Sequence, residues 1–302
     1  MGLRYAHPVW VIRAFRRALA AEDRADELAA LLEADNASPS VTLTALPGLA
    51  DVPAEAVPTP FSPIGFRSAG GDPASLVVAS GGRIRVQDEG SQLAALALTR
   101  ALPVRAGEQW LDLCAAPGGK TAVLAAEALA HGAHVEANEL SPARAGLVRD
   151  SVSGIPLEVP VSEEDGRTRA GRGRYDRILV DAPCTGLGAL RRRPEARWRK
   201  QPADVPTLAA LQTELLEAAI AALGPGGVVA YVTCSPHLAE TAGIVSEALR
   251  THAGEVEELD ARAVVASVSQ NPIDLADGSG RAQLWPHRHG TDAMSISLLR
   301  RR

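Results

Sequence analysis

The chain has 302 residues, of which 46% are hydrophobic and 22% charged, with a formal net charge of −5. This composition is typical of a globular protein with one large domain or two ordinary ones. No apolar run reaches the roughly 20 residues that cross a bilayer, and the first residues lack the apolar stretch of a signal peptide. We therefore expect a cytoplasmic protein that does not enter the membrane. The negative charge weighs mildly against a nucleic-acid partner, because phosphates bind cations.

Residues 1–84 are expected to form a small N-terminal α+β domain. An apolar stripe predicts a helix over 7–35, and alternating apolar residues predict a short strand over 40–46. Five prolines between 47 and 63 interrupt regular structure, and a second strand is expected over 83–87. The pattern changes at about residue 85, where we place a domain boundary.

Residues 85–302 show predicted helices and strands in alternation. Helices are expected over 91–102, 120–130, 142–151, 208–223 and 238–249, and strands over 109–114, 133–138, 157–161, 176–181, 227–234 and 294–299. Such alternation predicts an α/β fold with a doubly wound, mostly parallel sheet, to which the last strand is added antiparallel. Sheets of this kind bind ligands at the carboxyl ends of their strands, so the functional residues are expected there.

The first strand of this region runs into a glycine-containing turn, Leu111-Asp112-Leu113-Cys114-Ala115-Ala116-Pro117-Gly118-Gly119-Lys120-Thr121. Small residues and glycines let a ligand approach the backbone, and the helix that follows presents free N–H groups. The segment matches neither the phosphate-loop pattern nor the dinucleotide fingerprint. An ordinary tight turn and a ligand site both remain open on this motif alone.

Acidic residues follow the next two predicted strands. Glu139 ends the segment Ala137-Asn138-Glu139, about 20 residues after the glycines, where a carboxylate can accept from both hydroxyls of a ribose. Together with the first turn, it indicates a cofactor that contains adenosine. Asp165, before Gly166, could accept from an adenine amino group, or it could be an ordinary turn aspartate.

Two of the three cysteines follow later strands. Cys184 lies in the segment DAPCTGLG, which begins at Asp181, and Cys234 lies in TCSP. A single cysteine in such a place is more often a small buried side chain. Two of them at neighbouring strand ends, one close to Asp181, indicate reactive thiols. Together with Cys114 they lie too far apart in sequence to indicate a disulfide framework, and none has a metal-binding spacing.

Arginines gather in two stretches. The first contains Arg191, Arg192, Arg193, Arg197, Arg199 and Lys200, and the second contains Arg167, Arg169, Arg172, Arg174 and Arg177. Such runs are either solvated loops or phosphate-binding surfaces, and charge alone does not decide between them. We expect the stretch 191–200 to lie beside the mouth of the site and to bind the phosphates of a nucleic acid there.

The segments LDLCAAPGGKT, ANE, EDGR, DAPCTGLG and YVTCSP, with QDEGSQ before them and WPHRHGTD after, resemble the Sun/Fmu (RsmB-like) family of RNA cytosine-5 methyltransferases. The resemblance covers 85–302 well and 1–84 loosely. It implies a Rossmann-like class I methyltransferase fold, S-adenosylmethionine as cofactor, and small-subunit ribosomal RNA as substrate, so RNA is the partner expected at the stretch 191–200. It implies Cys234 as the nucleophile and Cys184 as an aid to product release. It also implies a cofactor site formed by Cys114, Ala115, Ala116, Pro117, Gly118, Gly119, Lys120, Glu139, Asp165 and Asp181.

The chain departs from the family pattern in two places. Thr185 stands where serine is commoner. Bacterial relatives often carry a helical NusB-like RNA-binding domain ahead of these motifs, and residues 1–84 leave no room for one. We therefore expect either a short member of the family or part of a longer product.

The proposed chemistry explains why these residue types are needed. Carbon 5 of cytosine is a poor nucleophile until a thiolate adds at carbon 6, and a cysteine serves because its thiolate both attacks and leaves readily. Asp181 is placed to stabilise the resulting adduct at the ring nitrogen and amino group, so it is a candidate for catalysis as well as for cofactor binding. The target base must leave any stack to reach such a pocket.

Other functions remain open on sequence alone. A tRNA substrate fits the same motifs, and a DNA cytosine methyltransferase would use the Pro-Cys thiol, here Cys184, as its nucleophile. An amino-group methyltransferase would place an aromatic residue where Cys184 stands, which argues against that class. A non-catalytic RNA-binding assembly factor that retains the cofactor pocket would bind the cofactor without transferring methyl groups.

Overall fold

The computed structural model describes residues 1–68, 72–169 and 175–302. Arg172 and Arg174 of the second arginine stretch lie outside these residues. Within the described ranges, no helix is both long enough and apolar enough to cross a membrane.

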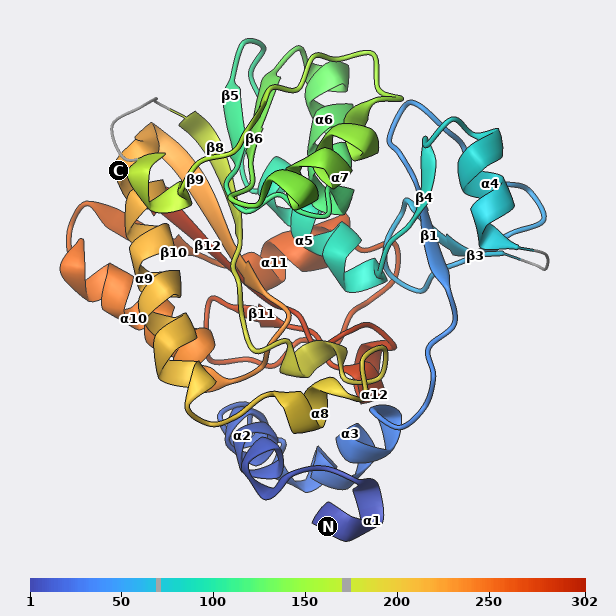
Figure 1. The fold of residues 1–302 in the computed structure, drawn as a ribbon. Helices are drawn as coiled ribbons and strands as arrows, with labels where there is room; N and C mark the ends of the chain where they lie inside the picture. The colour runs from blue at the N-terminus through green and yellow to red at the C-terminus, as the bar shows by residue number, and fades with distance from the viewer. Residues whose placement is uncertain (69–71, 170–174) are drawn as a thin grey trace.

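The larger of two sheets has the order β10-β12-β9-β8-β5-β6-β7, with β11 paired to β12 (Figure 1). Its parallel strands are β5 (Gln109–Asp112), β6 (His134–Asn138), β7 (Val161–Ser162), β8 (Tyr175–Asp181) and β9 (Leu223–Thr233). β12 (Ser295–Arg301) pairs antiparallel to β9, which confirms the antiparallel strand expected over 294–299. The doubly wound, Rossmann-like fold predicted from the alternation is therefore confirmed.

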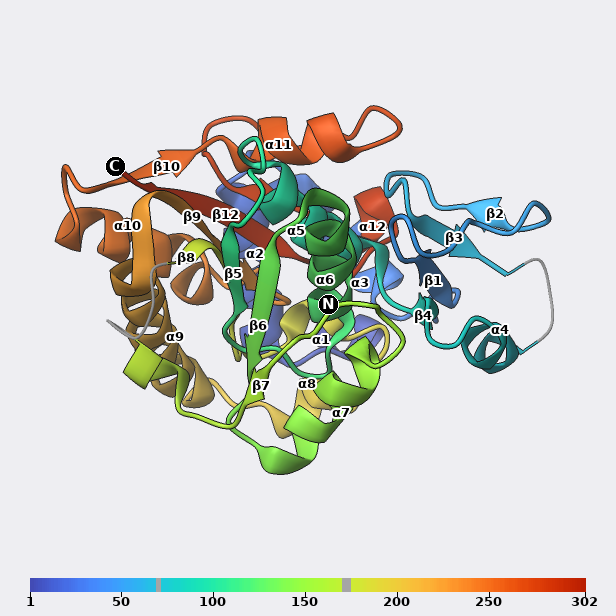
Figure 2. The same cartoon turned by 90° about the horizontal axis from the view of Figure 1, so that it is seen from above.

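Helices cover both faces of this sheet (Figures 1 and 2). One face packs against α5 (Glu89–Arg100), α6 (Gly119–His131) and α11 (Ala261–Val268), and the other against α9 (Asp204–Ala222) and α10 (Ala242–Thr251). α7 (Pro142–Val152) packs beside α6. In β8, Leu179 points into the first layer while Ile178 and Val180 point into the second. The strand is apolar throughout because both of its faces are buried.

Two predictions about strands need correction. The strand expected over 157–161 is reduced to β7, since Pro156 and Pro160 interrupt it and proline cannot donate to a sheet ladder. The sheet also contains two antiparallel strands that were not predicted, β10 (Val256–Leu259) and β11 (Ala282–Gln283), and both of them pair with β12. β10 contains two glutamates and β11 has only two residues, so neither gives a clear alternating pattern.

The continuous helix predicted over 7–35 is wrong. The chain instead forms α1 (Gly2–Tyr5), α2 (Val9–Ala20), the 3-10 turn η1 (Ala25–Glu27) and α3 (Leu28–Ala34). Asp23 has a φ of 57°, a left-handed conformation that a helix interior does not accommodate and that aspartate tolerates better than most residues. The apolar faces of α2 and α3 pack together with Leu187, Leu190, Trp285 and Ala293 of the larger region.

The remaining N-terminal residues form a small antiparallel sheet that lies apart from α1–α3 (Figure 1). Its order is β2 (Val57–Pro58), β3 (Gly65–Arg67), β1 (Thr42–Ala45) and β4 (Ile84–Val86), with α4 (Pro73–Ala79) beside β4. The fourth strand spans the boundary placed at residue 85, and the division into two domains stays a prediction. Short elements complete the chain: η2 (Gly166–Arg169), η3 (Leu187–Ala189), α8 (Ala196–Arg199), η4 (Leu238–Glu240) and α12 (Pro286–His289).

Candidate active site

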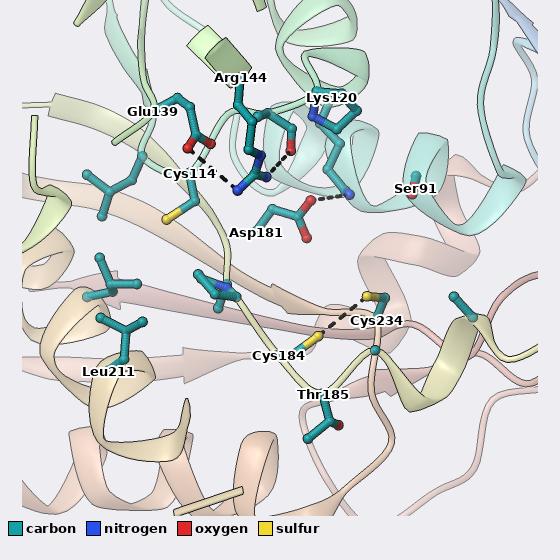
Figure 3. Close-up of a pocket in the computed structure, with 18 of the residues that line it drawn as sticks. Ser91, Cys114, Lys120, Glu139, Arg144, Asp181, Cys184, Thr185, Leu211 and Cys234 are labelled. Atoms are coloured by element: carbon teal, nitrogen blue, oxygen red, sulfur yellow. Dashed lines mark hydrogen bonds and ion pairs between the residues drawn. The ribbon is translucent and has the colours of Figure 1, made fainter. Parts of the chain in front are cut away.

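The carboxyl ends of the parallel strands surround a cavity of about 660 Å³ (Figure 3). Most of the residues predicted from the sequence line it: Cys114, Ala116, Pro117, Lys120, Glu139, Asp165, Asp181, Cys184 and Cys234. Ala115, Gly118 and Gly119 shape the turn without lining the cavity. Gly118 begins α6 with a φ of 103°, and a Cβ there would lie 2.5 Å from the Cβ of Ser151, so the turn can close against α7 only with glycine.

Asn138 fixes the turn after β5 against the neighbouring strand ends. Its side-chain amide donates to the carbonyl oxygens of Leu113 and Glu164, at 3.2 and 3.0 Å, and its oxygen accepts from the Ser162 hydroxyl. Three strand ends are thereby held in one arrangement by a single buried side chain. The next residue, Glu139, is presented to the cavity from this anchored position.

Only one oxygen of the Glu139 carboxylate, Oε1, has partners among the described residues. This oxygen accepts from the backbone N–H of Ser141 at 3.0 Å and lies 3.5 Å from Arg144 Nη1. Arg144 Nη2 donates to the carbonyl oxygen of Ala116 at 3.3 Å, so this arginine joins the first two strand ends (Figure 3). Arg144 has no local signal in the sequence, because it lies among small residues in the first turn of α7.

Asp165 combines the two roles that its sequence left open. It lines the cavity, and it also accepts from the backbone N–H of Arg167 at 3.0 Å, as a turn aspartate does. The Arg167 guanidinium binds both oxygens of the carboxylate, at 2.9 and 3.0 Å from Nε. These hydrogen bonds from Arg167 lower the pKa of Asp165.

Lys120 and Asp181 form an ion pair in the middle of the cavity. Lys120 Nζ lies 2.6 Å from Asp181 Oδ2, and Figure 3 shows the pair between Glu139 and the two cysteines. Burial disfavours the ammonium form of Lys120, but the Asp181 carboxylate outweighs burial and raises the pKa of Lys120. The cavity therefore contains a lysine that stays charged across neutral pH, together with a carboxylate that accepts its hydrogen bond.

The two later cysteines meet at the opposite end of the cavity. Their sulfur atoms lie 3.4 Å apart, although the residues are 50 positions apart in the sequence. The hydrogen bond to Cys234 and burial raise the pKa of the Cys184 thiol, so Cys184 keeps its proton and can donate it to the Cys234 sulfur. The Lys120 ammonium also interacts electrostatically with Cys234. This arrangement distinguishes the two sulfurs chemically.

Glu240 holds the two cysteine loops together from behind the cavity. Its Oε1 accepts from the backbone N–H of Thr185 at 2.7 Å, and its Oε2 accepts from the hydroxyls of Thr185 and Ser235 at 2.5 and 2.7 Å. Thr185 follows Cys184 and Ser235 follows Cys234, so one fully buried carboxylate fixes both loops. Thr185, where serine is commoner, uses its hydroxyl in this network. Glu240 was not predicted from the sequence, because its partners come together only in the folded chain.

The rim contains a buried cluster of two arginines and two aspartates. Arg191 binds Asp88 at 3.0 Å and Asp292 at 2.8 Å, and Arg192 binds the same two carboxylates at 2.7 and 3.0 Å. Burial, followed by repulsion from Asp88, raises the pKa of Asp292. The segments QDEGSQ and WPHRHGTD are thus joined to the loop after Cys184.

This cluster corrects the expectation that the whole stretch 191–200 faces RNA. Arg191 and Arg192 bind carboxylates, and Arg197 is buried against Asn36 and the backbone of Asp35. Of the remaining cations, Arg193 and Lys200 line the cavity and Arg199 is exposed. In the second stretch, Arg167, Arg169 and Arg177 all bind acidic side chains. A count of charges along the sequence gives no information about these partners.

The fold matches that of known structures. Among solved structures, PH0851 superposes with a TM-score of 0.83 and 26% identity, covering 99% of this chain and 67% of that one. NSun6 from Pyrococcus horikoshii, crystallised with SFG, superposes with a TM-score of 0.76 at 17% identity, over 95% and 97% of the two chains. The second likeness supports the fold alone.

Sequence comparison gives the family. A Mycobacterium tuberculosis protein named as a candidate methyltransferase is 52% identical over 98% of this chain and 64% of its own length. Ribosomal RNA small subunit methyltransferase B of Serratia proteamaculans is 39% identical over 72% of this chain and 47% of its own length. The chain thus spans less than two thirds of either relative. The family model for 16S rRNA methyltransferase RsmB/F matches residues 99–300, two thirds of the chain. The cofactor of this family is S-adenosylmethionine, as the sequence predicted, and the chain belongs to the RsmB/F methyltransferase family.

Proposed function

We propose that the protein transfers a methyl group from S-adenosylmethionine to carbon 5 of a cytosine in small-subunit ribosomal RNA, through a covalent adduct with Cys234. The observation that carries this proposal is the contact of 3.4 Å between the sulfurs of Cys184 and Cys234, in the same cavity as the Lys120–Asp181 pair. The names of relatives such as ribosomal RNA small subunit methyltransferase B support ribosomal RNA as the substrate.

The cavity wall near β5 and β6 fits the cofactor. Among the described residues, Glu139 Oε2 has no hydrogen-bond partner, so it is available to the ribose hydroxyls. Apolar side chains, including Leu113, Leu211 and Leu215, supply the flat contact that an adenine ring needs. Asp165 would accept from the adenine amino group. When bound, S-adenosylmethionine supplies an electrophilic methyl group.

Cys234 would begin the reaction as a thiolate that adds to carbon 6 of the target cytosine. A negative charge then develops on the pyrimidine ring at nitrogen 3 and oxygen 2, and carbon 5 becomes nucleophilic. The Lys120 ammonium can donate to these atoms while the Asp181 carboxylate accepts from the exocyclic amino group. Because both groups are held in place before the reaction, they stabilise the charge without reorganising.

Cys184 would act after methyl transfer. The proton on carbon 5 must leave before the bond between Cys234 and carbon 6 can break. Cys184, whose sulfur lies 3.4 Å from the Cys234 sulfur, would first lose its own proton to water and would then take the carbon 5 proton as a thiolate, while the electron pair left behind expels the Cys234 thiolate. Its raised pKa makes that thiolate a strong base and leaves Cys184 protonated again once the product is released.

The proposal is tested by methyl transfer to three substrates in parallel. Radiolabelled S-adenosylmethionine is incubated with the protein and ribosomal RNA, tRNA or DNA, and the modified base is mapped by nuclease digestion and mass spectrometry. Label in 5-methylcytosine of small-subunit ribosomal RNA supports the proposal. Label that is confined to tRNA or DNA, or that lies on an amino group, contradicts it.

A further inference from the structure

A second cavity of about 540 Å³ lies on the outer surface, away from the strand ends. Its walls come from α2, from the start of α9 with the residues before it, and from the turn η4 that follows Cys234. In Figure 1, α2 lies below α8 and the lower end of α9. We call this cavity the α2 groove. None of the residues assigned to the reaction lines it, so it is independent of the active-site cavity.

The charge of the α2 groove is opposite to that of the protein. The net charge of the chain is −5, yet Arg13 and Arg17 line the groove, and no aspartate or glutamate does within the described residues. The two arginines are exposed and lie one turn apart on α2. Neither forms an ion pair with any described residue, unlike Arg191 and Arg192 at the rim. Their guanidinium groups are therefore free to bind anions.

The groove also offers a surface for a flat ring. Trp10 is partly buried against the core formed by α2 and α3, which holds its indole in place beside the arginines. On the opposite wall, burial and the neighbouring charge of Arg17 lower the pKa of His237. His237 Nδ1 accepts from the backbone N–H of Ala239 at 3.2 Å, so the neutral ring has its proton on Nε2 and can donate a hydrogen bond.

The α2 groove adjoins the active-site cavity along the chain. Only Ser235 and Pro236 separate His237 from Cys234. On the other wall, Lys200 lines the active-site cavity and Pro202, two residues later, lines the groove. The residues that line the two cavities lie within a few positions of each other at both places, so a polynucleotide strand that leaves the active site over Lys200 can reach the groove.

We propose that the α2 groove binds a single-stranded segment of the substrate RNA that flanks the target cytosine. Arg13 and Arg17 bind its phosphates, and Trp10 stacks on one of its bases. This combination of unpaired cations and an aromatic surface is how single strands are bound without strict sequence recognition. The inference rests on the proposed function, since it takes RNA as the substrate.

The test compares RNA binding by the full chain and two double variants. Fluorescence anisotropy with a labelled single-stranded RNA of about 15 nucleotides containing one cytosine gives Kd at several salt concentrations. In Arg13→Gln/Arg17→Gln we expect Kd to rise at least about tenfold, and the slope of log K against log salt to become shallower by about 1.4, the value for two phosphate contacts on a single strand. Trp10→Leu should weaken binding and Trp10→Phe should restore it.

The matched control is Arg4→Gln/Arg16→Gln, which removes the same charge from exposed positions of α1 and α2 that do not line the groove. An equal loss of RNA affinity in both double variants would show a general effect of charge and would overturn the inference. An unchanged salt slope in Arg13→Gln/Arg17→Gln would overturn it as well and would leave the groove to a protein partner. If the wild type methylates ribosomal RNA while the groove variants bind RNA normally, only this inference fails. If the wild type methylates no RNA, the proposed function fails first.

Discussion

The sulfur atoms of Cys184 and Cys234 lie in contact, 3.4 Å apart, at the ends of two neighbouring strands. Each sulfur follows a different parallel strand, β8 or β9, so the contact is a product of the sheet order. It places one thiol whose pKa is raised beside another that interacts electrostatically with the Lys120 ammonium. Such a difference between the two thiols suits a reaction in which one sulfur attacks the base and the other exchanges a proton.

Glu240→Gln should slow methyl transfer while leaving cofactor binding intact. The amide cannot accept from the Thr185 N–H, the Thr185 hydroxyl and the Ser235 hydroxyl at the same time, so the two cysteine loops should shift relative to each other. A displacement of about 1 Å can cost on the order of 100-fold in rate. Steady-state assays should show a lower kcat, and calorimetry should show an unchanged Kd for S-adenosylmethionine. The exposed Glu247→Gln serves as the control. A normal kcat would remove Glu240 from this positioning role.

Glu139→Ala should weaken S-adenosylmethionine binding by about 1–3 kcal/mol, which is the cost of removing a charged hydrogen-bond acceptor. Isothermal titration calorimetry measures this directly. Glu163→Ala is the matched control, because Glu163 is an exposed glutamate that binds Arg149 and does not line the cavity. Equal affinities for Glu139→Ala and the wild type would place the ribose elsewhere.

Arg191→Ala should destabilise the protein by about 3–5 kcal/mol, since it leaves the buried carboxylates of Asp88 and Asp292 without one of their two partners. Arg193→Ala, at an exposed position two residues later, should change stability by less than about 0.5 kcal/mol. Urea denaturation of the two variants and the wild type provides the comparison. Similar midpoints for Arg191→Ala and Arg193→Ala would show that the rim cluster contributes little to stability.

Asp112→Asn should change how stability depends on pH. Burial, opposed in part by a hydrogen bond from Thr121, raises the pKa of Asp112 from 3.8 to about 7. Between these values the folded protein binds more protons than the unfolded chain. The contribution of Asp112 is therefore fully present below about pH 4 and is lost as the pH rises to 7.

The asparagine variant lacks this titration, so its unfolding free energy relative to wild type should rise from pH 5 to pH 8. Between pH 5 and pH 7 about two pKa units are crossed, which correspond to at most about 3 kcal/mol. Denaturation curves at pH 5, 6, 7 and 8 test the trend, with the exposed Asp150→Asn as control. A constant difference between wild type and Asp112→Asn across this range would contradict it.

The parallel strands and the location of the site were predictable because their signals are local. The apolar run of β8, the glycine turn before α6 and the cysteine after β9 each appear within about ten residues of sequence. Parallel strands bring their carboxyl ends to one edge of the sheet, so motifs that lie more than 100 residues apart can be assigned to a single cavity. Asp165 was placed correctly at the cavity, but its bond to Arg167 was not foreseen.

The parts that were missed depend on partners distant in sequence. Arg191 and Arg192 were expected to meet RNA, but their carboxylates come from positions about 100 residues away on either side. Glu240 has no motif around it, and its function arises because Thr185 approaches it from another strand end. The break between α2 and α3 occurs at Asp23 without a glycine or proline to mark it.

The central claim, that Cys234 attacks and Cys184 completes the reaction, is tested most directly by trapping the adduct. Cys184→Ala, Cys234→Ala and the double variant are each incubated with ribosomal RNA and S-adenosylmethionine, and the products are separated by denaturing electrophoresis. We expect Cys184→Ala to give a protein–RNA band that depends on RNA and is absent from Cys234→Ala and from the double variant. A misfolded protein cannot form this band, so a loss of stability cannot explain a band from Cys184→Ala. A band from Cys234→Ala, or none from Cys184→Ala, would contradict the assignment.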